Sequence, residues 1–82
     1  MHEFSLARAL VQLAERKLPA DGRRQVRTVT VRLGAFTGIP AESFAAAFEL
    51  ASAGTLLEGA RLEIEPAEGS DLLLVGLEVG ES

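Results

Sequence analysis

The chain has 82 residues, 48% of them apolar, with no cysteine, one histidine and a formal net charge of −4. This length suits one small domain, the apolar share argues against disorder, and the lack of thiols excludes disulfides and thiolate metal sites. The negative charge disfavours general nucleic-acid binding, and no apolar run reaches the roughly 18–20 residues of a membrane span, so we expect a soluble cytoplasmic protein.

The first predicted element is an amphipathic helix over residues 3–18. Leu6, Leu10 and Leu13 recur three and four positions apart, which places them on one stripe of a helix. Pro19 cannot continue a helix, so the element is expected to stop just before it.

The second predicted element is a strand over residues 26–33. Val29, Val31 and Leu33 alternate with polar residues, which gives the strand one apolar and one polar face. Val26 breaks this alternation, and it therefore predicts a bulge or a register change at the start of the strand.

A loop and a second helix follow. The loop covers residues 34–38 and begins and ends with glycines that can adopt positive φ. Pro40 is expected to open the helix, because a proline in the first turn removes no intrahelical hydrogen bond. The helix should run to about residue 51 and end before Gly54. Its predicted buried stripe consists of Phe44, Ala47, Phe48 and Ala51.

Two further strands are predicted at residues 60–65 and 72–79. The turn between them, at residues 66–70, is short, so the two strands are expected to pair as an antiparallel hairpin. The strands that flank the second helix should be parallel if they are adjacent. The predicted fold class is α+β, with two helices packed on one face of a three-stranded mixed sheet in the order α-β-α-β-β.

The alternation of side chains also predicts which residues of the last two strands face the helices. In the first of them these are Leu62 and Ile64. In the last strand the inward set is expected to be Leu73, Val75, Leu77 and Val79. Leu72 and Leu74 would then lie on the other face, which is either covered or part of an interface.

The candidate site for chemistry is the N-terminal tripeptide Met1-His2-Glu3. A free α-amine and an imidazole have ordinary pKa values of about 7.7–8.0 and 6.5, so both can be neutral donors near pH 7. The Met1 amine and the His2 amide nitrogen would close one chelate ring, and the His2 amide and imidazole nitrogens a second. Glu3 or a partner could supply the fourth donor. Such a nitrogen set suits Ni(II) or Cu(II), although a histidine at position two is by itself more often part of an ordinary exposed terminus.

The rest of the sequence carries no pattern typical of catalysis. None of the serines lies in a G-x-S-x-G context, and the glycines at 34 and 38 are not followed by the Gly-Lys-Ser/Thr of a phosphate-binding loop. We therefore expect a protein that is not an enzyme. Basic residues are concentrated in the first part of the chain, where they are either solvated or form a patch that steers an acidic partner. They are Arg16, Lys17, Arg23, Arg24, Arg27 and Arg32.

Four sequence blocks resemble the HypA/HybF family of nickel metallochaperones. They are M-H-E-F-S-L-A at residues 1–7, V-T-V-R-L-G-A-F-T-G-I-P-A-E-S-F at 29–44, G-T-L-L-E-G-A-R-L-E-I-E at 54–65, and G-S-D-L-L-L-V-G-L-E-V at 69–79. The blocks occur in the family's order and cover most of the chain.

The resemblance implies a function in nickel delivery. It implies that Met1, His2 and Glu3 bind Ni(II), with His2 as the indispensable ligand, for maturation of [NiFe] hydrogenase and in some organisms of urease. The implied partners are the maturation GTPase HypB and the hydrogenase large subunit. Arg8 and its neighbours on the first helix are candidates for the GTPase contact.

The sequence departs from the family between the last two strands. The family inserts there a zinc-binding domain with two C-x-x-C pairs, whereas this chain has only residues 66–70 and no cysteine. We therefore expect residues 1–82 to form a single nickel-binding domain that carries no zinc. The alternative function is an interaction module that docks the GTPase without efficient metal transfer.

Overall fold

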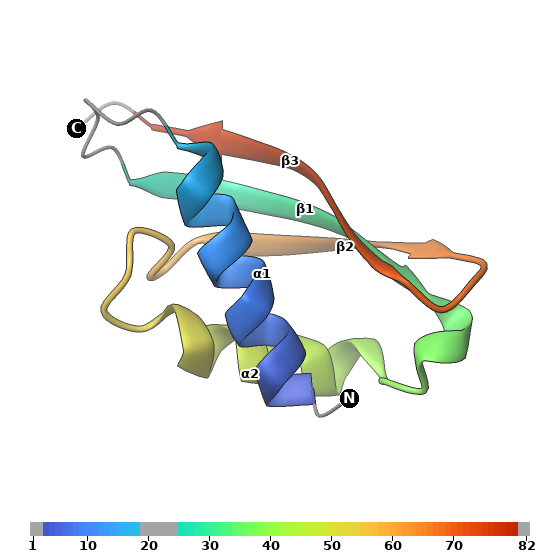
Figure 1. The fold of residues 1–82 in the computed structure, drawn as a ribbon. Helices are drawn as coiled ribbons and strands as arrows, with labels where there is room; N and C mark the ends of the chain where they lie inside the picture. The colour runs from blue at the N-terminus through green and yellow to red at the C-terminus, as the bar shows by residue number, and fades with distance from the viewer. Residues whose placement is uncertain (1–2, 19–24, 81–82) are drawn as a thin grey trace.

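Two helices cover one face of a three-stranded sheet, in the order α-β-α-β-β (Figure 1). The structure is a computed structural model and describes residues 3–18 and 25–80. The predicted α+β fold class is confirmed. The elements are α1 (Glu3–Lys17), β1 (Val26–Gly34), the short 3₁₀ helix η1 (Ala35–Thr37), α2 (Ala41–Ser52), β2 (Arg61–Ala67) and β3 (Leu72–Val79).

The helices form where the apolar periodicity predicted them. The most deeply buried residues of α1 are Ala7, Leu10, Val11 and Ala14, so the centre of its buried stripe carries two small alanines. In α2, Phe44, Ala47 and Phe48 are buried as predicted. Pro40 lies directly before α2 as its N-cap rather than inside it, and Gly54 beyond the C-terminal end has a φ of 79°. No helix among residues 3–18 and 25–80 combines the length and the apolar character needed to cross a bilayer.

β1 is the central strand of the sheet. It pairs in parallel with β2, as predicted, and antiparallel with β3, which gives the strand order β2-β1-β3. Its inward residues Val26, Val29, Val31 and Leu33 are 7% exposed or less, and they form the core together with the buried stripes of the helices. A central strand is covered on both edges, which suits the run of β-branched residues in β1.

The expected hairpin between β2 and β3 is wrong. The two strands do not pair with each other, because each of them pairs with β1. Strands two places apart in a sheet are separated by about 10 Å, and the four residues between β2 and β3 can span up to about 14 Å. A short turn therefore fits a bridge across the central strand as well as it fits a hairpin, and turn length alone could not separate the two.

The connection between β2 and β3 crosses the C-terminal end of β1. The Gly34 amide donates a hydrogen bond to the Asp71 carbonyl over 2.9 Å, and the Phe36 amide donates one to the Gly69 carbonyl over 2.8 Å. A Cβ atom at Gly34 would collide with the carbonyl group of Gly69. Gly34 has an ordinary φ of −69°, so this glycine is required by the close crossing and not by its own backbone conformation.

A bulge in β3 reverses the expected faces of its first half. Thr30 of β1 lies opposite Gly76, but the next residue, Val31, lies opposite Leu74, so Val75 is an extra residue in β3. A shift of one residue moves each later side chain to the opposite face. Leu77 packs inward as predicted, whereas the prediction for the other end of the strand is wrong.

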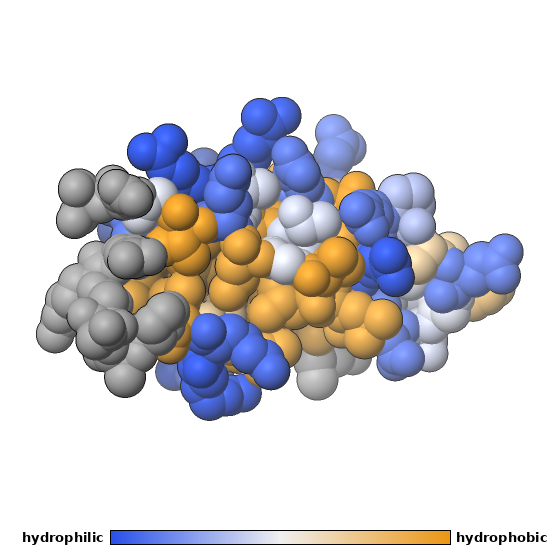
Figure 2. Space-filling view, turned by 90° about the horizontal axis from the view of Figure 1, so that it is seen from above, coloured by the Kyte–Doolittle hydropathy of each residue, from blue (hydrophilic) through white to orange (hydrophobic). Residues whose placement is uncertain are grey.

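The corrected inward residues at the start of β3 are Leu72 and Leu74, which pack against the core. Leu73 and Val75 point outward and are 54% and 44% exposed. A second irregularity separates Val26 from Thr28, which confirms the bulge expected at the start of β1. In β2, Leu62 and Ile64 pack against the core as predicted. Figure 2, which views the molecule from the side of β3, shows apolar residues gathered along this side.

We expect Gly34→Ala to lower the free energy of unfolding by about 1–3 kcal/mol, because its methyl group would collide with backbone atoms that cannot rotate away. Gly76→Ala is the matched control, since it also lies in the sheet and no atom is found within 4 Å of its added Cβ. This control should change stability by no more than about 0.5 kcal/mol. Urea denaturation of the three proteins measures both effects, and equal stability of the two variants would contradict the role given to the crossing.

Candidate metal centre at the start of helix α1

The structure places one of the three predicted ligand residues. Glu3 is the first residue of α1 and is half-buried, whereas Met1 and His2 lie outside the described residues. The tripeptide therefore leads directly into α1. Any donor atom that Glu3 contributes would be located at the N-terminal end of that helix.

The N-terminal end of a helix has two properties that bear on metal binding. Its first four amides have no acceptor within the helix, so the amide nitrogen of Glu3 can become a ligand without breaking a helical hydrogen bond. The helix dipole also favours negative charge at this end, where Glu3 is the acidic residue of the first turn. A carboxylate or a deprotonated amide is therefore compatible with the local fold.

A shallow cavity of about 330 Å³ lies between the start of α1 and the outer side of α2. It is lined by Glu3, Phe4, Ser43, Ala46, Ala47 and Leu50. Phe4 is 41% exposed and Leu50 is 70% exposed, so two large apolar side chains lie open beside the candidate ligand. Sequence reasoning did not single out either residue. The available signal was that both are large apolar residues that were not assigned to the buried stripe of their own helix.

The described part of the chain offers no alternative metal cluster. Among residues 3–18 and 25–80, no group of three or more histidine, cysteine, aspartate or glutamate side chains lies close enough together to hold an ion. The only histidine of the whole sequence is His2. If an imidazole of this chain binds metal, the tripeptide must supply it.

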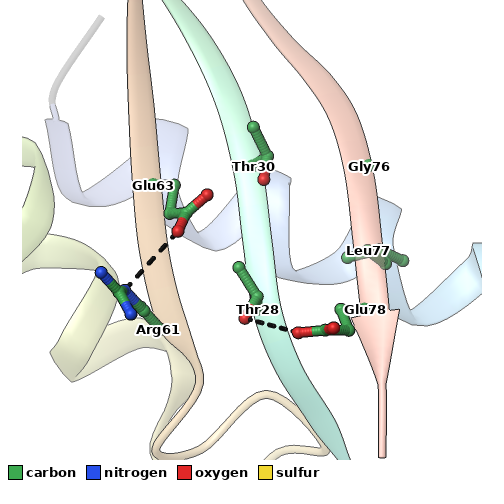
Figure 3. A pocket seen from close by; sticks show the side chains of 7 residues that line it. All are labelled: Thr28, Thr30, Arg61, Glu63, Gly76, Leu77 and Glu78. Carbon is green, nitrogen blue, oxygen red and sulfur yellow. Dashed lines mark hydrogen bonds and ion pairs between the residues drawn. The ribbon is translucent and has the colours of Figure 1, made fainter.

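The outer face of the sheet carries a polar hollow of about 420 Å³ (Figure 3). The Thr28 hydroxyl donates a hydrogen bond to Glu78 over 3.1 Å, and Arg61 lies 3.6 Å from a carboxylate oxygen of Glu63. Gly76 contributes no side chain, which leaves the space open. These exposed pairs join neighbouring residues on the outer face of the sheet, and such contacts add little stability. The hollow is too open to surround a ligand.

Within the described segments, the predicted basic residues do not all lie on one face of the molecule. Arg32 lies on the outer face of the sheet, with its guanidinium 3.1 Å from Glu65. Arg16 and Lys17 are exposed in the last turn of α1, which covers the opposite face. Arg8, the docking candidate, is exposed on α1, and residues 23 and 24 lie outside the described residues.

Comparison with known proteins places the chain in a family. The family model described as "Hydrogenase/urease nickel incorporation, metallochaperone, hypA" matches residues 1–71. The hydrogenase maturation factor HypA of Roseiflexus sp. (strain RS-1) is 48% identical over 65 residues, which cover 79% of this chain and 53% of that protein. HypA of Nitrosospira multiformis is 42% identical over 67 residues, covering 82% of this chain and 58% of that protein. The chain belongs to the HypA family.

A solved structure supports the fold. The solution structure of the Ni metallochaperone HypA from Helicobacter pylori matches with a TM-score of 0.71 at 18% sequence identity, over 99% of this chain and 88% of that one. In sequence, the chain spans between 53% and 58% of the length of the two relatives named above.

Proposed function

We propose that this chain is a nickel metallochaperone, a carrier and not an enzyme. It binds Ni(II) through Met1, His2 and Glu3 and delivers it during maturation of [NiFe] hydrogenase, and of urease where that enzyme is the client. The observation that carries the proposal is the match to the nickel-incorporation family from residue 1, so that the matched segment contains the whole tripeptide.

The chemistry of the tripeptide supports this assignment. The Met1 amine, the His2 amide nitrogen and the His2 imidazole can occupy three corners of a square plane, and Glu3 can occupy the fourth through its amide or its carboxylate. Ni(II) accepts such planar nitrogen-rich sets. The position of Glu3 at the start of α1 supports its role as the fourth donor. Its amide belongs to the first turn of α1, whose amides have no acceptor within the helix.

The location of the site supports transfer rather than storage. The tripeptide precedes an exposed helix end, and the neighbouring cavity is shallow and open. Ligands held on a chain end can be displaced one at a time by an acceptor. We therefore propose that the maturation GTPase of the HypB type, and then the hydrogenase large subunit, approach the tripeptide from this side.

Isothermal titration with Ni(II), using protein whose N-terminus is native and untagged, tests the ligand set. We expect one high-affinity site per chain, and we expect His2→Ala to weaken binding by at least about 100-fold, because the imidazole is lost together with the chelate ring that it closes with the amide nitrogen of residue 2. Glu3→Gln should weaken binding less. Glu42→Gln is the matched control for Glu3→Gln, since Glu42 is the acidic residue in the first turn of α2.

Acetylation of the Met1 amine provides a second test of the same ligand set. It converts the amine to an amide and leaves every side chain in place, so high-affinity binding should be lost. Unchanged affinity in either the His2→Ala protein or the acetylated protein would refute the proposed chelate.

Nickel affinity should also depend on pH. Protons compete with the metal for the amine and the imidazole, so affinity should fall steadily as the pH is lowered from about 8 to about 5.5, through the ordinary pKa values of both groups. Competition with a chromogenic chelator at each pH measures this. A constant affinity over that range would require a donor set made only of carboxylates.

The exposed Leu50 provides a test of docking. Leu50→Glu should weaken binding of a purified HypB-type GTPase by at least about tenfold, because it places a charge in the apolar surface beside the tripeptide. Ala45→Glu introduces the same charge at another exposed position of α2 and should bind normally. Both variants should keep the parent stability. Equal binding of the GTPase by the two variants would place its contact elsewhere. Docking of the GTPase without nickel transfer would favour the alternative function as an interaction module.

A further inference from the structure

An apolar groove of about 110 Å³ runs between α1 and β3. It is lined entirely by leucine and alanine: Leu6, Ala9, Leu10, Leu13, Leu72 and Leu74. Figure 2, seen from the side of β3, shows apolar residues gathered on this side of the molecule with polar residues along the border. The groove is separate from the cavity that contains Glu3, since none of its lining residues is shared with that cavity.

The strand beside this groove is an edge strand. β3 pairs only with β1, so among the described residues no strand pairs with the outward amides and carbonyls of β3. Almost all side chains of β3 are apolar, and Leu73 and Val75 are exposed on the outer face of the sheet. An exposed edge of this composition is a template for pairing with another strand.

The two ends of the groove carry opposite charges. Asp71 lies at the end where Leu6 meets Leu72, because the three residues line one cavity. Arg16 and Lys17 follow Leu13 by three and four positions, so they extend the groove-lining face of α1 by one turn at the other end. An occupant that fits must therefore be apolar along its length, with an acidic group at the basic end and a basic group at the acidic end.

A second copy of the same chain meets these requirements. We propose that two copies associate along this groove with their β3 strands antiparallel, so that their sheets join into one six-stranded sheet. In antiparallel pairing, directly opposite side chains lie on the same face. If the two-fold axis passes beside Leu73, each Leu73 faces its counterpart on the outer face, and Leu72 of one copy faces Leu74 of the other on the inner face.

The same two-fold axis brings the charges together. It places the Leu6 end of one groove beside the Leu13 end of the other. Asp71 of each copy therefore lies beside Arg16 and Lys17 of its counterpart. The bulge at Val75 bends the edge, which limits the regular pairing to the short segment from Asp71 to Val75. The contact is therefore a small one.

The required area is modest for this chain. A specific interface needs a total buried area of about 1,000 Å², which is roughly 500 Å² from each copy or about a tenth of the 5437 Å² exposed by one chain. An interface at this lower limit predicts a reversible dimer with a dissociation constant in the micromolar range or weaker.

Sedimentation equilibrium of the metal-free protein in a chelating buffer, from about 1 μM to about 1 mM, tests this interface. We expect a concentration-dependent dimer. Ala9→Glu should weaken the dimer at least tenfold, because Ala9 is exposed in the groove and the new carboxylate would be enclosed there. Ala45→Glu on α2 is the matched control and should dimerise normally. Circular dichroism checks that both variants are folded. If Ala9→Glu does not fold, Val75→Lys is used in its place.

A charge exchange tests the proposed orientation. Asp71→Arg should weaken the dimer, and adding Arg16→Asp together with Lys17→Asp should restore it, because the paired signs are then reversed at both ends. A monomer at every concentration would overturn the proposal. So would a dimer that the groove substitutions leave unchanged, or one that the triple variant fails to restore relative to Asp71→Arg.

Discussion

The architecture depends on the crossing of the β2–β3 connection over the end of β1. The two hydrogen bonds from Gly34 and Phe36 to this connection hold it against the central strand. Because the connection passes over β1, strands β2 and β3 lie on opposite sides of it, and β1 is buried between them. The same crossing makes β3 an edge strand and places its inward leucines against α1.

Much of this arrangement could be predicted from the sequence. The helices follow from leucine, alanine and phenylalanine residues spaced three and four apart, and the parallel pairing of β1 and β2 follows from the helix between them. The faces of β3 could not be predicted, because a run of four apolar residues from Leu72 to Val75 contains no polar residue that would mark the bulge. The strand order could not be predicted either, since a four-residue connection fits two arrangements.

The candidate site, like the fold, could be predicted from the sequence only in part. The tripeptide could be proposed from the sequence because His2 is the only imidazole and directly follows Met1, and because residues 1–7 resemble the start of the nickel metallochaperone family. The apolar surface of Phe4 and Leu50 could not, because it is assembled from two helices that lie side by side only in the folded chain. Periodicity identifies the stripe that is buried, but it does not distinguish a stray apolar residue from a functional one.

The placement of β2 and β3 on either side of β1 has a consequence for length variation. Because neither strand depends on the other for its hydrogen bonds, residues added between Ala67 and Leu72 would lengthen a closed loop without unpairing the sheet. The entropic cost of closing such a loop grows only logarithmically, by about 0.6 kcal/mol for each doubling of its length. This fold can therefore carry a large appendage at that point, provided that the backbone contacts at Gly34 are kept.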